Sequence, residues 1–284
     1  MNCQQQIETK NLDIEILLPT IGAIVHNVDL SQSLDKKVAD QIEQALVKHQ
    51  VLFFRDQRLT SSQQRDFARL FGNLSLAFPF SPHVKDMPEI TIFEHGPNLK
   101  PNNDVWHTDT TFTETPPLGC VLYAREIPPI GGDTLWSSMC SAYDTLSLPM
   151  QQFLSTLSAE HSYTKYYNYT NVTDTDQLET AKREFPPSVI HPVIRTHPIT
   201  KRKCLFVNIL YTTRILGLND NESEMLLSYL FGLVNKPEYT VRWHWKVNDI
   251  AFWDNRSTQH YAIADYWPNC RRMERASIIG DKPF

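Results

Sequence analysis

The chain has 284 residues, of which 41% are hydrophobic and 21% charged, and its formal net charge is −5. This composition excludes a disordered or fibrous protein. The acidic balance argues against nucleic acid as a partner, because nucleic-acid binders present a basic face to phosphates. At this length we expect one domain over residues 1–284 with a substantial core.

The cysteines and the first residues of the chain indicate the cellular compartment. The cysteines are Cys3, Cys120, Cys140, Cys204 and Cys270. They show no C-x-x-C spacing and are odd in number, which favours a reducing compartment. The start, MNCQQQIETKNLDIEI, lacks a basic stretch followed by an apolar run, and no run of about 18 apolar residues indicates a membrane span. We therefore expect a cytoplasmic protein.

The first elements alternate between helix and strand. Residues 35–50 place apolar side chains at helical spacing, and residues 60–72 begin with Thr60 and Ser61 as candidate helix caps. Between them, VLFFRDQ (51–57) reads as a buried strand. The apolar stripe of the first helix consists of Val38, Ile42, Leu46 and Val47.

From about residue 88 onward the chain consists mainly of short apolar runs broken by Pro, Gly, Asn and Asp. This spacing is typical of a β-sandwich or barrel. Residues 141–161 and 221–235 have helical periodicity instead. With no internal repeat, the pattern predicts a mixed β class: a double-sheet core with helices covering one side.

A candidate metal site begins in DVWHTDTTF. On a strand, His107 and Asp109 would project to the same face, although a chance H-x-D is common in a chain with ten histidines. His260 follows the apolar run 250–253, just past the expected end of a strand. Two histidines and one carboxylate suit Fe(II), because they leave coordination positions open. A structural zinc site would need a fourth ligand, usually Cys, and we expect no cysteine near either half.

An arginine-rich segment, CRRMER, follows His260. Arg271 and Arg275 are four residues apart and would share a face of a strand, pointing into the same mouth as His260. Such guanidinium groups bind carboxylate or sulfonate in a bidentate fork. A solvated basic surface is the alternative, which the apolar ASIIGD that follows disfavours.

Several blocks together resemble a known family. WHTDTTF, GGDTLW, WDNRSTQHYAIADY and RASIIGDKPF are similar to the Fe(II)- and 2-oxoglutarate-dependent dioxygenases of the taurine dioxygenase (TauD/TfdA) family. The resemblance runs from about residue 12 to the C-terminus. It implies a double-stranded β-helix (jelly-roll, cupin-like) core with flanking and inserted α-helices, and often a homodimer or homotetramer.

The resemblance also implies roles for individual residues. The implied iron ligands are His107, Asp109 and His260. Thr134 and Arg271 would hold the distal carboxylate of 2-oxoglutarate, and Arg275 and Asn103 would contact the prime substrate. With O2, such an enzyme hydroxylates a small carboxylate or sulfonate and converts 2-oxoglutarate to succinate and CO2. Because Asp109 is present, hydroxylation rather than halogenation is expected.

The substrate pocket departs from the taurine enzymes. Phe78 stands where those enzymes place a histidine, Tyr166 and Tyr167 replace a Ser-Phe pair, and Tyr211 replaces a phenylalanine. These rings favour a substrate with more apolar bulk than taurine, although they could equally belong to the core or the surface. We expect His191, His197 and His244 to be structural, and Trp106, Trp136 and Trp253 to shield the site from water.

Three alternatives stay open. The first is taurine dioxygenase proper, releasing sulfite and aminoacetaldehyde. The second is a non-catalytic jelly-roll protein that binds a metal or a small acid, which would be expected to have lost at least one of the residues named above. The third is a structural zinc protein, which has too few ligands here.

Overall fold

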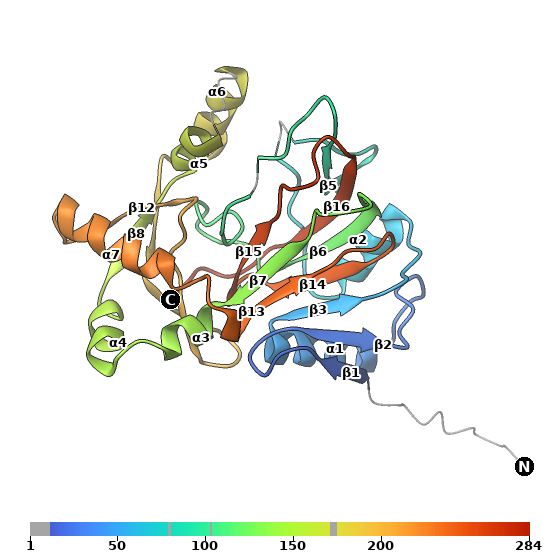
Figure 1. The fold of residues 1–284 in the computed structure, drawn as a ribbon, viewed down its shortest axis with the longest axis horizontal. Coiled ribbons are helices and arrows are strands. Elements are labelled where there is room, and N and C mark those ends of the chain that lie inside the picture. Colours follow the sequence, from blue (N-terminus) through green and yellow to red (C-terminus); the bar gives the residue numbers. More distant parts are fainter. Residues whose placement is uncertain (1–11, 79–80, 103, 171–174) are drawn as a thin grey trace, which may run out of the picture.

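The computed structural model describes residues 12–78, 81–102, 104–170 and 175–284 (Figure 1). The strands are β1 (Asp13–Ile16), β2 (Ala23–His26), β3 (Val51–Phe54), β4 (His83–Val84), β5 (Met87–His95), β6 (Gly119–Glu126), β7 (Thr134–Ser138), β8 (Ser158–His161), β9 (Val189–Pro192), β10 (Ile194–Thr196), β11 (Lys203–Leu205), β12 (Thr212–Ile215), β13 (Thr240–Trp243), β14 (Ile250–Asp254), β15 (Thr258–Ala262) and β16 (Arg271–Ile278). The helices are α1 (Lys36–His49), α2 (Ser61–Arg69), α3 (Met139–Asp144), α4 (Leu148–Leu154), α5 (Tyr163–Thr170), α6 (Thr175–Glu184), α7 (Asp220–Gly232) and a 3-10 turn, η1 (Pro237–Tyr239).

The largest sheet has eight strands in the order β1-β2-β3-β14-β6-β16-β5-β4. A three-stranded sheet, β13-β7-β15, packs against one face of it, and its strands pair antiparallel. Further small sheets are β12-β8-β9 and β10-β11. Figure 1 shows the eight-stranded sheet and the sheet β13-β7-β15 layered together, with α5 and α6 projecting away from them. The predicted mixed β class is confirmed.

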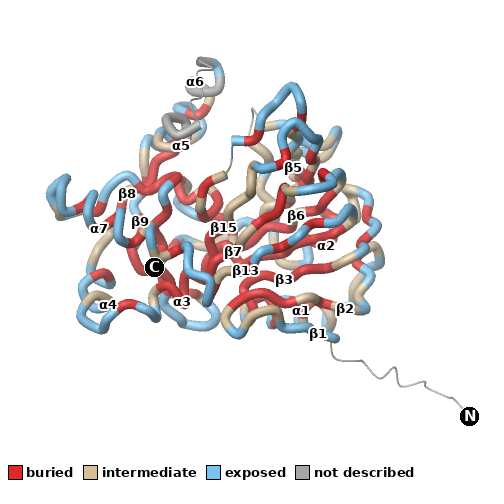
Figure 2. Tube along the Cα trace, in the orientation of Figure 1, coloured by how far each residue is buried: buried red, intermediate tan, exposed pale blue. Residues whose placement is uncertain are grey.

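Alternation along the central strands explains this layering. On β14, Ile250 and Phe252 belong to the core under α1 and α2, whereas Ala251 and Trp253 belong to the core between the two sheets. Because successive side chains of a strand point to opposite faces, a strand that is buried on both faces has a continuous apolar run. Figure 2 shows these strands as buried and the outer surfaces of α4 and α7 as largely exposed.

The two predicted N-terminal helices are confirmed as α1 and α2. Asp35 caps α1 by accepting from the backbone N–H of Val38. Thr60 caps α2 in a reciprocal capping box with Gln63, which leaves Ser61 as the first helical residue. These caps satisfy backbone N–H groups that have no partner within the helix, so each helix begins at a defined residue.

The helical prediction for residues 141–161 is wrong in part. The structure has α3 and α4 there, and residues 158–161 form β8. Pro149 stands in the first turn of α4, where a residue without a backbone N–H is tolerated, so a new helix begins after Ser147. β8 then pairs with both β9 and β12, and this pairing overrides the helical periodicity of its sequence.

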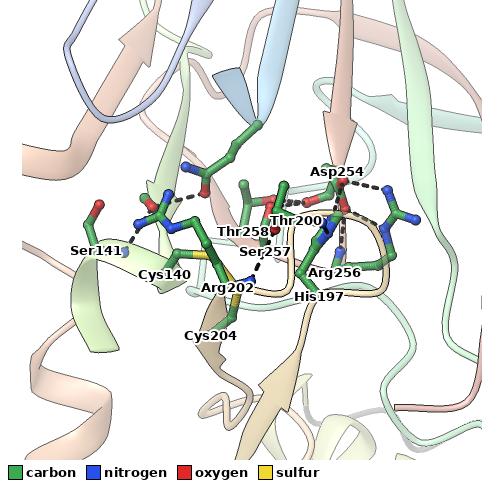
Figure 3. The surroundings of a disulfide bond; sticks show 12 residues. Cys140, Ser141, His197, Thr200, Arg202, Cys204, Asp254, Arg256, Ser257 and Thr258 are labelled. Atoms are coloured by element: carbon green, nitrogen blue, oxygen red, sulfur yellow. Dashed lines mark hydrogen bonds and ion pairs between the residues drawn. A yellow bond between two sulfur atoms is a disulfide. The ribbon is translucent and has the colours of Figure 1, made fainter. Parts of the chain in front are cut away.

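The C-terminal prediction for residues 221–235 is confirmed as α7, which packs with α3 and α4 over β8 and β11. Within this region Cys140 of α3 and Cys204 of β11 form a disulfide that the sequence did not predict (Figure 3). Both cysteines are buried. No helix in the described part of the chain is long and apolar enough to cross a membrane.

Candidate active site

Three buried side chains converge on one point between the sheets: His107, Asp109 and His260. One candidate ligand atom from each lies within 4.8 Å of the others. Nε2 of His107 lies 3.8 Å from Oδ1 of Asp109, and Nε2 of His260 lies 3.9 Å from Oδ2. Over the described ranges, no other cluster of His, Cys, Asp or Glu side chains meets this geometry. The donor set fits a divalent iron with open coordination positions.

The backbone brings the two histidines together. His107 and His260 form an isolated antiparallel bridge, with N–H to O distances of 3.0 and 2.8 Å. The expected continuous strand through 107–109 is therefore wrong, because Asp109 lies in the turn that follows the bridge. His260 lies inside β15 rather than past a strand end. The carboxylate is thus aimed by a turn, not by the alternation of a strand.

Both imidazoles are held in the neutral form that binds metals. Burial lowers the pKa of His260 to about 3, and it also lowers the pKa of His107. Nδ1 of His107 lies 2.8 Å from the carbonyl oxygen of Val105. This contact makes Nδ1 the donor and leaves Nε2, on the side of Asp109, with a free lone pair.

Asp109 is charged and in contact at both oxygens. Nη1 of Arg275 lies 2.7 Å from Oδ1, and Sγ of Cys120 lies 3.4 Å from Oδ2. Burial opposes ionisation of Asp109, but the guanidinium of Arg275 outweighs it and holds the pKa of Asp109 well below its ordinary value. The expectation that no cysteine lies near the pair is wrong, since β6 turns Cys120 toward the site. Burial raises the pKa of Cys120, which keeps it a thiol, and its sulfur is not part of the group of candidate ligand atoms.

A second cationic position lies on the same strand face. Arg271 is 4% exposed, donates from Nε to the carbonyl oxygen of Gly132 at 3.0 Å, and places Nη2 3.4 Å from Oγ1 of Thr134. The Thr134 hydroxyl also accepts from the indole of Trp245 at 3.0 Å. The predicted pair of Thr134 and Arg271 is therefore brought together. A solvated basic surface is excluded for Arg271 and Arg275.

Comparison with known proteins decides the family. The model of the family "Taurine catabolism dioxygenase TauD, TfdA family" matches residues 13–277. The chain belongs to the TauD/TfdA family. It is an Fe(II)- and 2-oxoglutarate-dependent dioxygenase, and the non-catalytic and structural-zinc alternatives no longer stand.

Named relatives of this TauD/TfdA chain differ in substrate. An "Alpha-ketoglutarate-dependent sulfate ester dioxygenase" of Pseudomonas putida is 36% identical over 96% of this chain and 91% of its own length. An "Alkylsulfatase" of Acinetobacter baylyi is 36% identical over 97% of this chain and 87% of its own. Alpha-ketoglutarate is 2-oxoglutarate.

Solved structures agree with the TauD/TfdA fold. A taurine dioxygenase from Burkholderia xenovorans has a TM-score of 0.84 and 34% identity, covering 96% of this chain and 91% of that one. A structure titled "AAD-2 in complex with Mn(II) and N-oxalylglycine" has a TM-score of 0.81 and 30% identity, covering 96% of this chain and 99% of that one.

The predicted substrate residues of the TauD/TfdA enzyme fall into two groups. Phe78, Tyr166 and Tyr211 join one aromatic cluster around Phe112, whose ring centroid lies 5.1 Å from that of Tyr211 and 5.8 Å from that of Phe78. Tyr166 lies 6.2 Å from Tyr211 between ring centroids. Asn103 and the side chain of Tyr167 lie outside the described residues.

Sequence reasoning missed two contacts of Asp109. Cys120 reaches the carboxylate from β6, and Asn255 bonds the backbone of Asp109. For Asn255 a signal was present, because it follows Asp254 directly in the matched block WDNRSTQH. For Cys120 the sequence held no such signal beyond its place in an apolar strand, because only the packing of β6 against the turn brings Cys120 and Asp109 together.

Of the three histidines that were expected to be structural, His191 and His197 are buried and hydrogen-bonded, whereas His244 is exposed. Nε2 of His191 donates to the carbonyl oxygens of Thr111 and Thr113 at 2.9 and 3.0 Å. His197 contacts the buried carboxylate of Asp254 at 2.9 Å, where Arg256 also binds (Figure 3). His244 lies on the surface against Asp133.

Proposed function

We propose that His107, Asp109 and His260 hold Fe(II) in this dioxygenase. The observation that carries the proposal is the buried group of two neutral imidazoles and one carboxylate, with ligand atoms within 4.8 Å of one another. When bound, Fe(II) and 2-oxoglutarate use O2 to oxidise a C–H bond, with succinate and CO2 as co-products. The chain's own contribution is to hold the two imidazoles neutral and the carboxylate of Asp109 ionised, and to exclude water.

We propose that Arg271 and Thr134 bind the distal carboxylate of 2-oxoglutarate. A buried guanidinium calls for an anionic partner. Within the described part of the chain, Arg271 bonds the neutral groups of Gly132, Thr134 and Tyr266, so a bound carboxylate would supply the negative charge. Gly132 leaves room beside it: a Cβ added there would lie 3.1 Å from Cδ of Arg271. Tyr266, whose ring lies 5.8 Å from the guanidinium, closes another side.

We propose that Arg275 binds the anionic group of the prime substrate and that the aromatic cluster receives its apolar body. Arg275 lies near enough to Tyr166 and Tyr211 to interact electrostatically with both phenols. From there, Phe112 and Phe78 extend the apolar surface. A charged head beside rings suits an alkyl or aryl anion better than the polar amine of taurine.

The substrate class we favour is a sulfate ester or a sulfonate, with a carboxylate as the runner-up. The relatives at 36% identity are named for sulfate esters and alkyl sulfates, and one of Saccharomyces cerevisiae at 30% identity is named for sulfonates. Hydroxylation of the carbon that bears the anionic group gives an unstable product. It collapses to an aldehyde and releases sulfate from an ester or sulfite from a sulfonate.

The deciding experiment measures succinate together with sulfate or sulfite. The Fe(II)-loaded enzyme is given 2-oxoglutarate, O2 and one of four substrates: taurine, a medium-chain alkyl sulfate, the matching alkyl sulfonate, or a phenoxyacetate. We expect the alkyl sulfate or sulfonate to stimulate succinate release with matching sulfate or sulfite. Stimulation by taurine alone would overturn the proposed apolar pocket. Full turnover by Asp109→Ala would overturn the metal site.

We propose further that residues 1–284 form one domain with a double-stranded β-helix core. The packing of β13-β7-β15 on the eight-stranded sheet supports this arrangement. We also propose a homodimer or homotetramer, which light scattering tests. For a cytoplasmic location, the free thiols of Cys120 and Cys270 argue in favour and the disulfide of Cys140 and Cys204 argues against, and cell fractionation decides between them.

A further inference from the structure

The carboxylate of Asp109 depends on a turn whose backbone has no strand partner at that residue. The side chain of Asn255 takes the partner's place. The N–H of Asp109 donates to Oδ1 of Asn255 at 2.9 Å, and Nδ2 of Asn255 donates to the carbonyl oxygen of Asp109 at 3.2 Å. A primary amide offers both an acceptor and donors, so one side chain can reproduce the paired bonds of a β-bridge.

The same amide connects the turn with two other segments. Nδ2 of Asn255 also donates to the carbonyl oxygen of Pro117 at 3.2 Å, and the backbone N–H of Asn255 donates to that of Leu118 at 2.9 Å. These residues lead directly into β6. Asn255 itself follows β14 and precedes β15, which carries His260. The amide therefore ties the turn of Asp109 to the connection between β14 and β15, and β15 supplies a histidine of the group.

Burial makes these bonds difficult to replace. Asn255 is 1% exposed, so water cannot take over the bonds of the amide if it is removed. On its far side the turn is held through Thr111, whose hydroxyl lies 2.9 Å from Nδ1 of His161 and 3.0 Å from Nδ2 of Asn208. With Thr111 held, loss of Asn255 frees the turn at Asp109 itself.

We propose that Asn255 is a positioning residue that orients Asp109 toward the metal. The inference rests on the proposed role of Asp109 as a ligand. Asn255 does not touch the metal or the substrate in this scheme; it fixes the backbone from which the carboxylate projects. Removing such an outer partner of a metal ligand typically weakens metal binding by about 10- to 100-fold.

The test is a titration of the metal-free enzyme with Mn(II), followed by electron paramagnetic resonance. We expect Asn255→Ala to raise the Kd for Mn(II) by about 10-fold or more. Gln57→Ala is the matched control, since Gln57 is also a buried amide with two donor bonds, to Val28 and Arg55, and one accepted from Leu30, but it lies on the loop after β3. Gln57→Ala should lower the melting temperature without changing the Kd.

The outcomes distinguish failure of the positioning role of Asn255 from failure of the proposed metal site. A folded Asn255→Ala enzyme with the parent Kd, or an equal rise in Gln57→Ala, overturns the positioning role. Asp109→Ala with the parent Kd overturns the metal site itself. If Asn255→Ala does not fold, Asn255→Ser decides: its short side chain cannot make both bonds to the backbone of Asp109, so a folded variant with the Kd of the parent counts against the proposal.

Discussion

Nη1 of Arg275 lies 2.7 Å from Oδ1 of Asp109, so the carboxylate of the His-Asp-His group is paired with a partly buried cation. In our proposal this cation also receives the anion of the prime substrate. The two roles are compatible because a guanidinium carries five N–H donors in a planar fork. An entering anion can therefore bind beside Asp109 and be placed next to the metal position.

Replacement of Arg275 should weaken the response to the prime substrate. We expect Arg275→Ala to raise the KM for that substrate by about 10- to 100-fold, since a hydrogen bond to a charged group contributes about 1.5–3 kcal/mol. Slow succinate formation without prime substrate should continue. Steady-state assays with and without substrate measure both. Loss of 2-oxoglutarate binding would show instead that Arg275 belongs to the cofactor position.

Replacement of Arg271 should act on 2-oxoglutarate. We expect Arg271→Ala to raise the KM for 2-oxoglutarate by about 10- to 100-fold, with Mn(II) affinity retained. Arg272→Ala is a control one residue away, because Arg272 lies on the opposite face and pairs with Glu94 and Glu274. An unchanged KM in Arg271→Ala, or an equal rise in Arg272→Ala, would contradict the assignment.

Stability should fall on mild acidification because of His191. Burial lowers the pKa of His191 to about 4 in the folded protein, below the ordinary value of 6.5. Between these pH values the unfolded chain binds more protons, so the free energy of unfolding decreases as pH falls. From pH 6.5 to 5 we expect a loss of about 2 kcal/mol from this side chain. Urea unfolding should show a shallower pH dependence for His191→Gln and no such change for the exposed His83→Gln.

Reduction should destabilise the protein through the disulfide of Cys140 and Cys204. The bond joins cysteines 64 residues apart. Closing a loop of that length reduces the conformational entropy of the unfolded chain and raises its free energy by about 4 kcal/mol. We expect Cys140→Ser to lower the free energy of unfolding by an amount of this order, and a reductant to have no further effect on that variant. Cys270→Ser removes an exposed thiol and is the control. Equal stability of the parent and Cys140→Ser would show that the bond contributes nothing.

The sequence by itself determined much of the reaction centre. The helix cap at Thr60, the apolar run 250–253 and the spacing of Arg271 from Arg275 all depend on neighbours along the chain. Such local patterns have fixed periods, 3.6 residues for a helix and two for a strand, so the sequence predicts them directly. The identity of the three candidate metal ligands and the pair formed by Thr134 and Arg271 followed from the residues and their matched blocks.

Only the tertiary structure decided how Asp109 is aimed. The pair of His107 and Asp109 reads as a strand, but its backbone partners, His260 and Asn255, lie more than a hundred residues away. Arg275 lies more than a hundred residues from Asp109 as well, and 64 residues separate the two cysteines of the disulfide, Cys140 and Cys204. Residues 158–161 became a strand for a related reason, because pairing with β9 and β12 satisfies their backbone better than a helix would. Contacts between distant segments have no period in the sequence, and they arise only when burial of both sheet faces brings the segments together.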